Sequence, residues 1–175
     1  TPISGWFQCA GERGCGLAIA IIISRQLSKN FAVDLLLTNG HELGMCGGYH
    51  LAQSYDQELG FVLHLGSCIA NIDTKVTSIC SANKVTAGRI AVSLKKLGIE
   101  PVIISDPDNA KNWVGESKCW VSNKVPILSI AGLAPHFHTR SDLPEIVTNP
   151  GLLHATIEVI GDSALAMANH GKIKI

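Results

Sequence analysis

The chain lacks an excess of charge of either sign. Among its 175 residues, fourteen lysines and arginines balance fourteen aspartates and glutamates, so the formal net charge is zero. Nucleic acids and anionic membranes attract proteins through clustered positive charge. We therefore expect no nucleic-acid partner and no membrane partner. A small molecule or a peptide is the expected ligand.

The chain also lacks an apolar run long enough to cross a membrane. The run from Leu17 to Ile23 is far shorter than the roughly 20 residues that a spanning helix needs. We interpret it as part of a buried helix. The sequence begins with Thr1, and no signal-peptide pattern precedes this helix. We therefore expect the sequence to be a processed product or an excised piece of something longer.

No pair of cysteines has the C-x-x-C spacing, which argues against a zinc knuckle and against a thioredoxin-type motif. Scattered cysteines in a domain of this size are typical of small apolar core residues, so we expect reduced thiols. Because the count is even, a disulfide framework is the alternative. The six cysteines are Cys9, Cys15, Cys46, Cys68, Cys80 and Cys119.

What the chain does have is enough apolar material for one domain over residues 1–175, with 46% hydrophobic residues. Helical and extended patterns alternate along it. This alternation predicts an α/β fold, a three-layer α/β/α sandwich of the phosphorylase/hydrolase-like kind with a mostly parallel (mixed) central sheet. The expected helices cover residues 14–29, 44–57, 83–97 and 150–169, and the expected strands cover 31–37, 61–65, 101–104 and 126–130.

Ionisable side chains gather where the predicted strands end. His41 and Glu42 follow one strand directly, His64 lies in the next, and His136 and His138 follow a later one. The carboxyl ends of parallel strands meet at one edge of a sheet, where open α/β sheets hold their ligands. We therefore expect these side chains to approach one pocket.

A glycine-rich turn over residues 11–16 carries Glu12 and Arg13 and opens the first predicted helix. Such turns bind phosphate in some proteins, but this one lacks the Lys-Ser/Thr pair of a P-loop. A carboxylate together with two or three imidazoles is a set of ligands that zinc takes. The sequence therefore indicates a candidate metal site more than a phosphate site.

Simpler roles are open for each of these residues. His41 and Glu42 would also suit the start of the following helix, where the dipole favours a carboxylate. His64 inside an apolar strand is typical of a core histidine with a hydrogen-bond partner. His136 and His138 would also suit a solvated loop.

Four segments follow one another in a distinctive order. They are the turn at 11–16, His41-Glu42-Leu43-Gly44-Met45-Cys46-Gly47, His64-Leu65-Gly66, and His138-Thr139-Arg140-Ser141-Asp142. This order resembles the zinc aminopeptidase superfamily, which includes bacterial leucyl aminopeptidases, glutaminyl cyclases and glutamate carboxypeptidases. In that family the counterparts are a glycine-rich segment, Glu-Glu-x-Gly-Leu-x-Gly, Asn-Leu-Asp and His-Thr-x-x-Asp. The last match is the most specific.

The resemblance implies roles for single residues. The second glutamate of the family's pair, a zinc ligand, corresponds to Glu42, and the final histidine ligand corresponds to His138. The first glutamate, the family's general base, corresponds to His41. An imidazole with an ordinary pKa of about 6.5 is able to take a proton from a water molecule near neutral pH.

The chain departs from the family pattern at the remaining ligands. No His-x-Asp precedes the glycine-rich turn, and only Glu12 lies near the place of the bridging aspartate. Gly66 takes the place of the Asn-Leu-Asp ligand, with His64 two residues earlier. The family's first strands would lie upstream of Thr1. We therefore expect a bare sheet edge that a partner segment or a second copy of the chain covers.

The resemblance implies a metal-dependent hydrolase of amide or peptide bonds, with zinc held by Glu42 and His138 and completed by Glu12 or His64. The alternative is a non-catalytic aminopeptidase-like scaffold or interaction domain, because fold does not guarantee activity. A third interpretation is a metal-free hydrolase that uses His41 with Glu42 or a nearby nucleophile. Ser67 and Cys68 are the candidates for that nucleophile.

Overall fold

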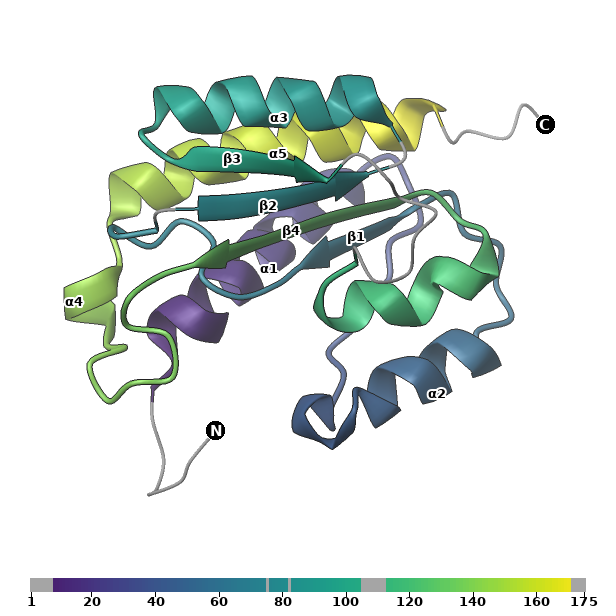
Figure 1. Cartoon of the computed structure of the whole chain (residues 1–175). Helices are drawn as coiled ribbons and strands as arrows, with labels where there is room; N and C mark the ends of the chain where they lie inside the picture. Colours follow the sequence, from purple (N-terminus) through teal and green to yellow (C-terminus); the bar gives the residue numbers. More distant parts are fainter. Residues whose placement is uncertain (1–7, 75, 82, 105–112, 171–175) are drawn as a thin grey trace.

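The structure, a computed structural model, describes residues 8–74, 76–81, 83–104 and 113–170. Four strands form one sheet in the order β1-β4-β2-β3 (Figure 1). Strands β1 and β4 are parallel, as are β2 and β3, whereas β2 and β4 are antiparallel. The sheet is therefore small and mixed. The strands are β1 (Val62–Leu65), β2 (Val76–Ser81), β3 (Glu100–Ile104) and β4 (Ile127–Leu133).

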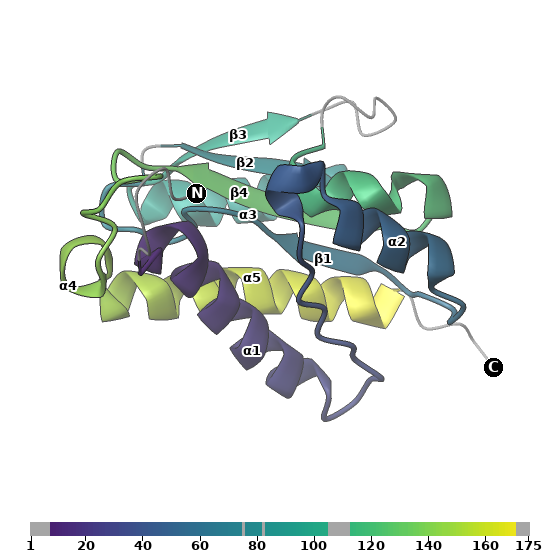
Figure 2. The same ribbon diagram turned by 90° about the horizontal axis from the view of Figure 1, so that it is seen from below.

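Three long helices pack against one face of the sheet (Figures 1 and 2). They are α1 (Cys15–Leu27), α3 (Lys84–Lys96) and α5 (Pro150–His170). The buried faces of these helices supply isoleucine, leucine and alanine at helical spacing, which builds the main core. Asn83 caps α3, since its side chain accepts a hydrogen bond from the amide of Thr86.

A second, smaller core lies on the other side of β1 and β4. It contains Trp113, Cys119 and Trp120 from the segment that includes η4 (Gly115–Asn123), and Ala52 from α2 (Cys46–Ser54). Figure 2 shows α2 and η4 lying side by side on this face. The shorter elements are η1 (Ala10–Gly14), η2 (His41–Leu43) and α4 (Pro144–Val147).

The alternation of side chains along the strands decides which residues face which core. Leu63 and Leu65 of β1 pack with the main core, whereas Val62 packs with the smaller one. Because successive side chains point to opposite faces, His64 lies on the same face as Val62. Its register partner on β4 is Ser129. The strand pattern therefore directs His64 toward η4.

The strand predicted at 31–37 is wrong. No described strand pairs with this stretch, and it contains no helix or strand. Phe31 and Val33 pack against the main core, but Leu35, Leu36 and Leu37 are exposed, Leu37 by 72%. Apolar content alone does not make a strand, because a strand also needs a neighbour for its backbone hydrogen bonds. The expectation that a partner segment or a second copy of the chain covers a bare edge of the sheet stays a prediction.

Strand β2 and the 3-10 helix η4, which contains Trp120, were not among the elements expected from the sequence. The other predicted helices and strands are confirmed, with ends within a few residues. The five cysteines whose side chains are described, Cys9, Cys15, Cys46, Cys68 and Cys119, are free thiols. Across the described residues, no helix combines the length and the apolarity that crossing a membrane requires.

We predict that Gly132→Ala destabilises the protein strongly. Gly132 lies in β4, and a Cβ added there would come within 2.3 Å of the carbonyl oxygen of Cys68. The clash is with backbone, which has little room to move, so we expect a loss of at least about 1–3 kcal/mol in the free energy of unfolding. Urea denaturation measures this loss.

Gly88→Ala is the matched control. Gly88 lies inside α3, and an added Cβ meets nothing within 4 Å. Alanine favours a helix interior over glycine by up to about 1 kcal/mol, so this variant should be equally or more stable than the wild type. Equal stability of the two variants would contradict the described packing of β4 against the loop that carries Cys68.

Candidate functional site

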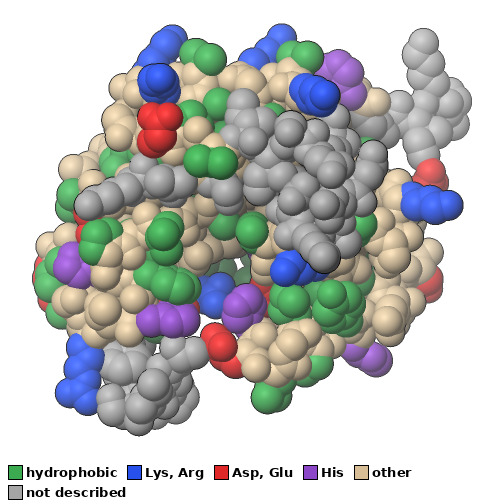
Figure 3. Space-filling view, viewed as in Figure 1, with side chains coloured by type: hydrophobic (Ala, Val, Ile, Leu, Met, Phe, Trp, Pro, Cys, Tyr) green, Lys and Arg blue, Asp and Glu red, His purple; other side chains and the backbone are tan. Residues whose placement is uncertain are grey.

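A pocket of about 160 Å³ lies beside the carboxyl ends of the parallel strands β1 and β4. This position agrees with the expectation for an open α/β sheet. Figure 3 shows a hollow on this face with histidine and basic side chains beside it. The lining residues are Arg13, His41, His64, Gly66, Ser67, Val114, Gly115, Glu116, Ala131 and Phe137.

A single helical turn presents His41 to the pocket. The turn η2 lies between Gly40 and Gly44, whose φ angles are +72° and +73°. Only glycine adopts this left-handed backbone without strain, and a Cβ at Gly40 would also meet the sulfur of Cys46 at 2.3 Å. The glycines of the sequence motif therefore set the direction of the histidine.

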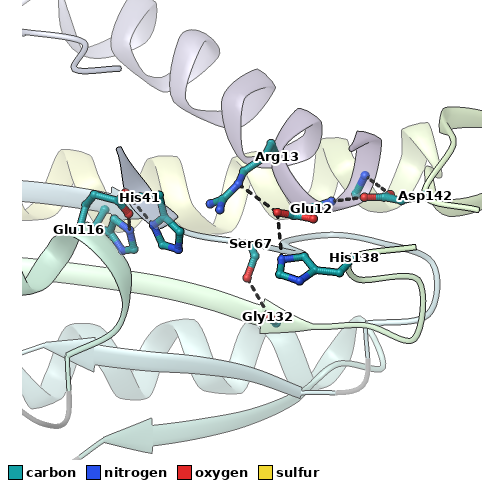
Figure 4. Close-up of polar contacts among 10 residues, drawn as sticks. Glu12, Arg13, His41, Ser67, Glu116, Gly132, His138 and Asp142 are labelled. Carbon is teal, nitrogen blue, oxygen red and sulfur yellow. Dashed lines mark hydrogen bonds and ion pairs between the residues drawn. The ribbon is translucent and has the colours of Figure 1, made fainter. Parts of the chain in front are cut away.

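The imidazole of His41 is held by a carboxylate that lies 75 residues away in the chain. Its Nδ1 lies 2.8 Å from Oε1 of Glu116, at the start of η4 (Figure 4). A carboxylate only accepts hydrogen bonds, so Nδ1 donates the proton. In the neutral ring, Nε2 is then the basic nitrogen. This is the arrangement in which a carboxylate orients a histidine general base.

Glu116 is partly buried, yet its charged form is strongly favoured. The nearby imidazole of His64 and the hydrogen bond from His41 lower the pKa of the Glu116 carboxyl to about 2, although burial acts to raise it. His64 Nε2 is 3.9 Å from Oε2 of Glu116, which is too far for a good hydrogen bond. We therefore treat the contact with His64 as electrostatic and the contact with His41 as the directional one.

His64 is itself fixed in position. Its Nδ1 lies 2.8 Å from Oγ of Ser129, the residue opposite it on β4. Gly115, with φ of +52°, leaves room for the ring, because a Cβ there would lie 3.2 Å from two ring atoms. Both imidazoles that face Glu116 are thus held by the fold.

A second cluster lies at the start of α1, around the buried carboxylate of Glu12. Arg13 Nε and His138 Nε2 each lie 3.4 Å from the same oxygen, Oε1. The His138 ring stacks on Phe137, with ring centres 3.8 Å apart. Figure 4 shows this cluster beside Ser67, with the end of the Arg13 side chain directed toward the side where His41 and Glu116 lie.

Asp142 holds this second cluster in place. One carboxylate oxygen accepts the amide of Gly11 at 2.6 Å, and the other accepts the amide of Glu12 at 2.9 Å. These are amides of the π-helical turn η1 that precedes α1, so the carboxylate satisfies donors that have no partner within the helix. The aspartate of the His-Thr-x-x-Asp segment therefore has a structural role here.

The structure brings some of the predicted site residues together and separates others. Glu12 and His138 are in contact, and His41 and His64 meet through Glu116. Glu42 is exposed and makes no hydrogen bond or ion pair with a described residue. Beyond the five predicted residues, His136 lies outside the pocket lining and pairs with Asp73 at 3.3 Å.

The residues of this site do not fit a zinc ion. Within the described part of the chain, no group of three or more histidine, cysteine, aspartate or glutamate side chains is arranged to hold a metal. A Cβ at Gly66, the place of one family ligand, would come 2.8 Å from the Cβ of Ala131. A Cβ at Gly11 would come 2.1 Å from Nδ2 of Asn71. The space for additional carboxylates is therefore already filled.

The two candidate nucleophiles, Ser67 and Cys68, differ in accessibility and in reactivity. Ser67 lines the pocket, and its hydroxyl donates to the carbonyl of Gly132 at 3.3 Å. Cys68 is buried, and burial raises the pKa of its thiol to about 11. A thiol with that pKa is protonated at neutral pH and is a poor nucleophile. Of the two, only Ser67 suits a reactive role.

Together, the sheet, its helices and the pocket at the strand ends define a mixed α/β domain with an aminopeptidase-like fold. The chain is similar to two solved structures of LapA from Legionella pneumophila, one of them described as an aminopeptidase. Their TM-scores are 0.61 and 0.63, at 15% and 14% sequence identity. The matches cover 95% and 99% of this chain but 49% of each LapA chain.

The chain is also similar to an aminopeptidase from Aneurinibacillus sp. strain AM-1, with a TM-score of 0.59 and 14% identity, over 90% of this chain and 39% of the other. This chain therefore spans about half or less of these proteins. No protein-family model and no curated protein sequence matches it. At such low identity the similarity establishes the fold and leaves the activity open. It confirms the predicted aminopeptidase resemblance.

The sequence did not reveal Glu116 as a site residue. It lies in a stretch between Trp113 and Trp120 that shows no clear periodicity, and no motif surrounds it. The one available signal is an acidic residue directly after a glycine in a segment bounded by two tryptophans. Its contacts with His41 and His64 depend on how η4 packs over β1, which the chain's order does not give.

We predict that Glu116→Gln lowers the free energy of unfolding near neutral pH and reduces the dependence of this free energy on pH in the acid range. A lowered carboxyl pKa stabilises the fold fully above about pH 4.5, and this contribution is lost as the pH falls toward 2. After allowance for solvent screening, we expect a difference on the order of 1–2 kcal/mol at pH 7 that shrinks toward pH 2. Urea denaturation at a series of pH values measures it.

Glu158→Gln is the control for this series. Glu158 pairs with His154 on the exposed side of α5, where both side chains are largely solvated. An exposed pair of this kind contributes little, so its removal should leave the pH dependence unchanged. If Glu116→Gln showed the same pH slope as the wild type, Glu116 would not be the strongly ionised carboxylate described above.

Proposed function

We propose that this domain hydrolyses amide or peptide bonds without a metal ion, with His41 as the general base and Glu116 as the residue that orients it. The observation that carries the proposal is the 2.8 Å contact between His41 Nδ1 and the Glu116 carboxylate, in a pocket at the strand ends. The aminopeptidase-like fold supports the reaction class by analogy alone.

The reaction balances with water and these side chains. In a two-step version, Ser67 attacks first and forms an ester, which a water molecule activated by His41 later hydrolyses. In the direct version, His41 Nε2 takes a proton from a water molecule as the water oxygen attacks the carbonyl carbon. The imidazolium then gives its proton to the leaving amine nitrogen as the carbon–nitrogen bond breaks. Glu116 stays ionised throughout, stabilises the imidazolium and fixes the position of the proton on Nδ1.

A non-catalytic aminopeptidase-like scaffold or interaction domain is the second candidate. The filled position at Gly66 and the exposure of Glu42 favour it, because they remove donors that the metal-dependent reaction needs. The metal-dependent hydrolase, with zinc held by Glu42, His138, Glu12 and His64, has the weakest support. The predicted three-layer sandwich likewise remains part of the proposal.

We predict hydrolysis of peptide or aminoacyl-amide substrates that persists when a chelator is present. His41→Ala should reduce kcat/KM by about 10²–10⁴, the usual contribution of a general base. The rate should also depend on pH, because an imidazole acts as a general base only in its neutral form. Steady-state kinetics across pH, with and without chelator, test both expectations.

His154→Ala is the matched control for this assay, because His154 is an exposed histidine on α5. It should leave kcat/KM unchanged. Full activity in His41→Ala, or loss of activity on chelation, would refute the proposed mechanism. Absence of hydrolysis across a broad panel of amides would favour the scaffold.

We also predict that the purified protein contains much less than one zinc ion per chain. Glu12 and His138 alone provide two donors, whereas zinc in proteins takes three or four. Elemental analysis measures the metal content, and added zinc should leave the melting temperature unchanged. One zinc per chain, lost in the double variant Glu12→Gln/His138→Ala, would contradict this prediction and support the metal-dependent hydrolase.

A further inference from the structure

Most polar groups that line the pocket already contact other groups of the protein. The Glu116 carboxylate already faces two imidazoles, one at hydrogen-bond distance. His64 is bound to Ser129 through Nδ1, and the Ser67 hydroxyl is engaged by a backbone carbonyl. The acceptors of the pocket are thus largely occupied by groups of the protein.

Arg13 is different. Its Nε lies 3.4 Å from Glu12, while the end of the guanidinium points away from Glu12, toward the His41 side of the pocket (Figure 4). Its side chain is 44% exposed and lines the pocket, whereas Glu12 is buried. Glu12 therefore holds the arginine by one edge and leaves its outer edge directed to the ligand space. A guanidinium presented in this way matches a planar carboxylate.

The carboxylate of Asp142, which anchors the turn that carries Arg13, does not compete for this arginine. Asp142 is buried, and both of its oxygens accept backbone amides of Gly11 and Glu12. Phe137 adds an apolar wall to the same pocket. The volume of about 160 Å³ holds roughly five water molecules at the liquid's ~30 Å³ each. This space suits a small acid or one end of a peptide.

We infer that Arg13 is a specificity-determining residue that binds the carboxylate of a small organic acid or of a peptide's C-terminal residue. The inference rests on the proposed use of this pocket as the substrate site, and it names the class of substrate. The amide bond next to the carboxylate then lies on the side of the pocket that holds His41 and Ser67.

The test compares two ligands that differ only in this group, N-acetylglycine and N-acetylglycinamide. Isothermal titration calorimetry, or ligand-observed NMR for weak binding, gives both affinities. We expect N-acetylglycine to bind at least about tenfold more tightly, because a bidentate contact with arginine is among the stronger hydrogen-bonded pairs. Equal affinities, or no binding of either ligand, would overturn the inference.

Arg13→Gln should abolish the preference for the carboxylate, and Arg13→Lys should leave a preference smaller than that of the wild type, because lysine keeps the charge beside Glu12 without the planar fork. Arg25→Gln is the matched control, since Arg25 is an exposed arginine in the last turn of α1, the helix that follows the turn carrying Arg13. Melting temperatures establish that each variant folds. A preference that persists in folded Arg13→Gln would overturn the inference, and so would inorganic phosphate binding more tightly than N-acetylglycine.

The outcomes separate this inference from the proposed function. His41→Ala should lose hydrolysis but keep the Arg13-dependent binding of N-acetylglycine. Arg13-dependent binding in a wild-type protein that hydrolyses no amide would refute the proposed function alone. Hydrolysis that depends on His41 but is equally fast for free and amidated C-termini would refute the role of Arg13 alone.

Discussion

The carboxylate of Asp142 joins two parts of the chain that lie 131 residues apart in sequence. By accepting the amides of Gly11 and Glu12, it fixes the turn before α1 against the loop after β4. That turn carries Glu12 and Arg13, and the loop carries His138. The contacts around Glu12 depend on this anchor, because a buried amide without a partner costs about 1–3 kcal/mol.

Glu116 plays the corresponding part on the other side of the pocket. It links η2 and β1 through His41 and His64, two residues that the chain order places on separate elements. The low pKa of Glu116 keeps the carboxylate charged across the physiological range, so it constantly favours one orientation of His41. This fixed orientation of His41 is the geometric basis of the proposed function.

The domain has the aminopeptidase-like fold but a different set of polar groups at its strand ends. Glycines stand at residues 11 and 66, and neighbouring side chains fill the space that longer side chains would need. Glu42 keeps the residue type of a family ligand but points to solvent, while the adjacent His41 faces the pocket. A residue type kept in sequence is therefore not evidence of a ligand kept in space.

The sequence predicted the helices best, because apolar residues at helical spacing, as in α1, α3 and α5, identify a buried face without information about neighbours. It was less informative for strands. Residues 31–37 are as apolar as a buried strand but remain unpaired, and β2 was not expected, because pairing depends on partners elsewhere in the chain.

By itself, the sequence determined that His64 lies in a strand, that His138 follows a later strand and that Glu12 precedes the first long helix, because helical and extended patterns are local properties. Only the tertiary structure decided how they pair. The packing of η4 over β1 and β4 brings Glu116 to His41 and His64, and the loop after β4 brings His138 to Glu12. Contacts between distant segments depend on packing in three dimensions, and the local periodicity of the sequence carries no information about that packing.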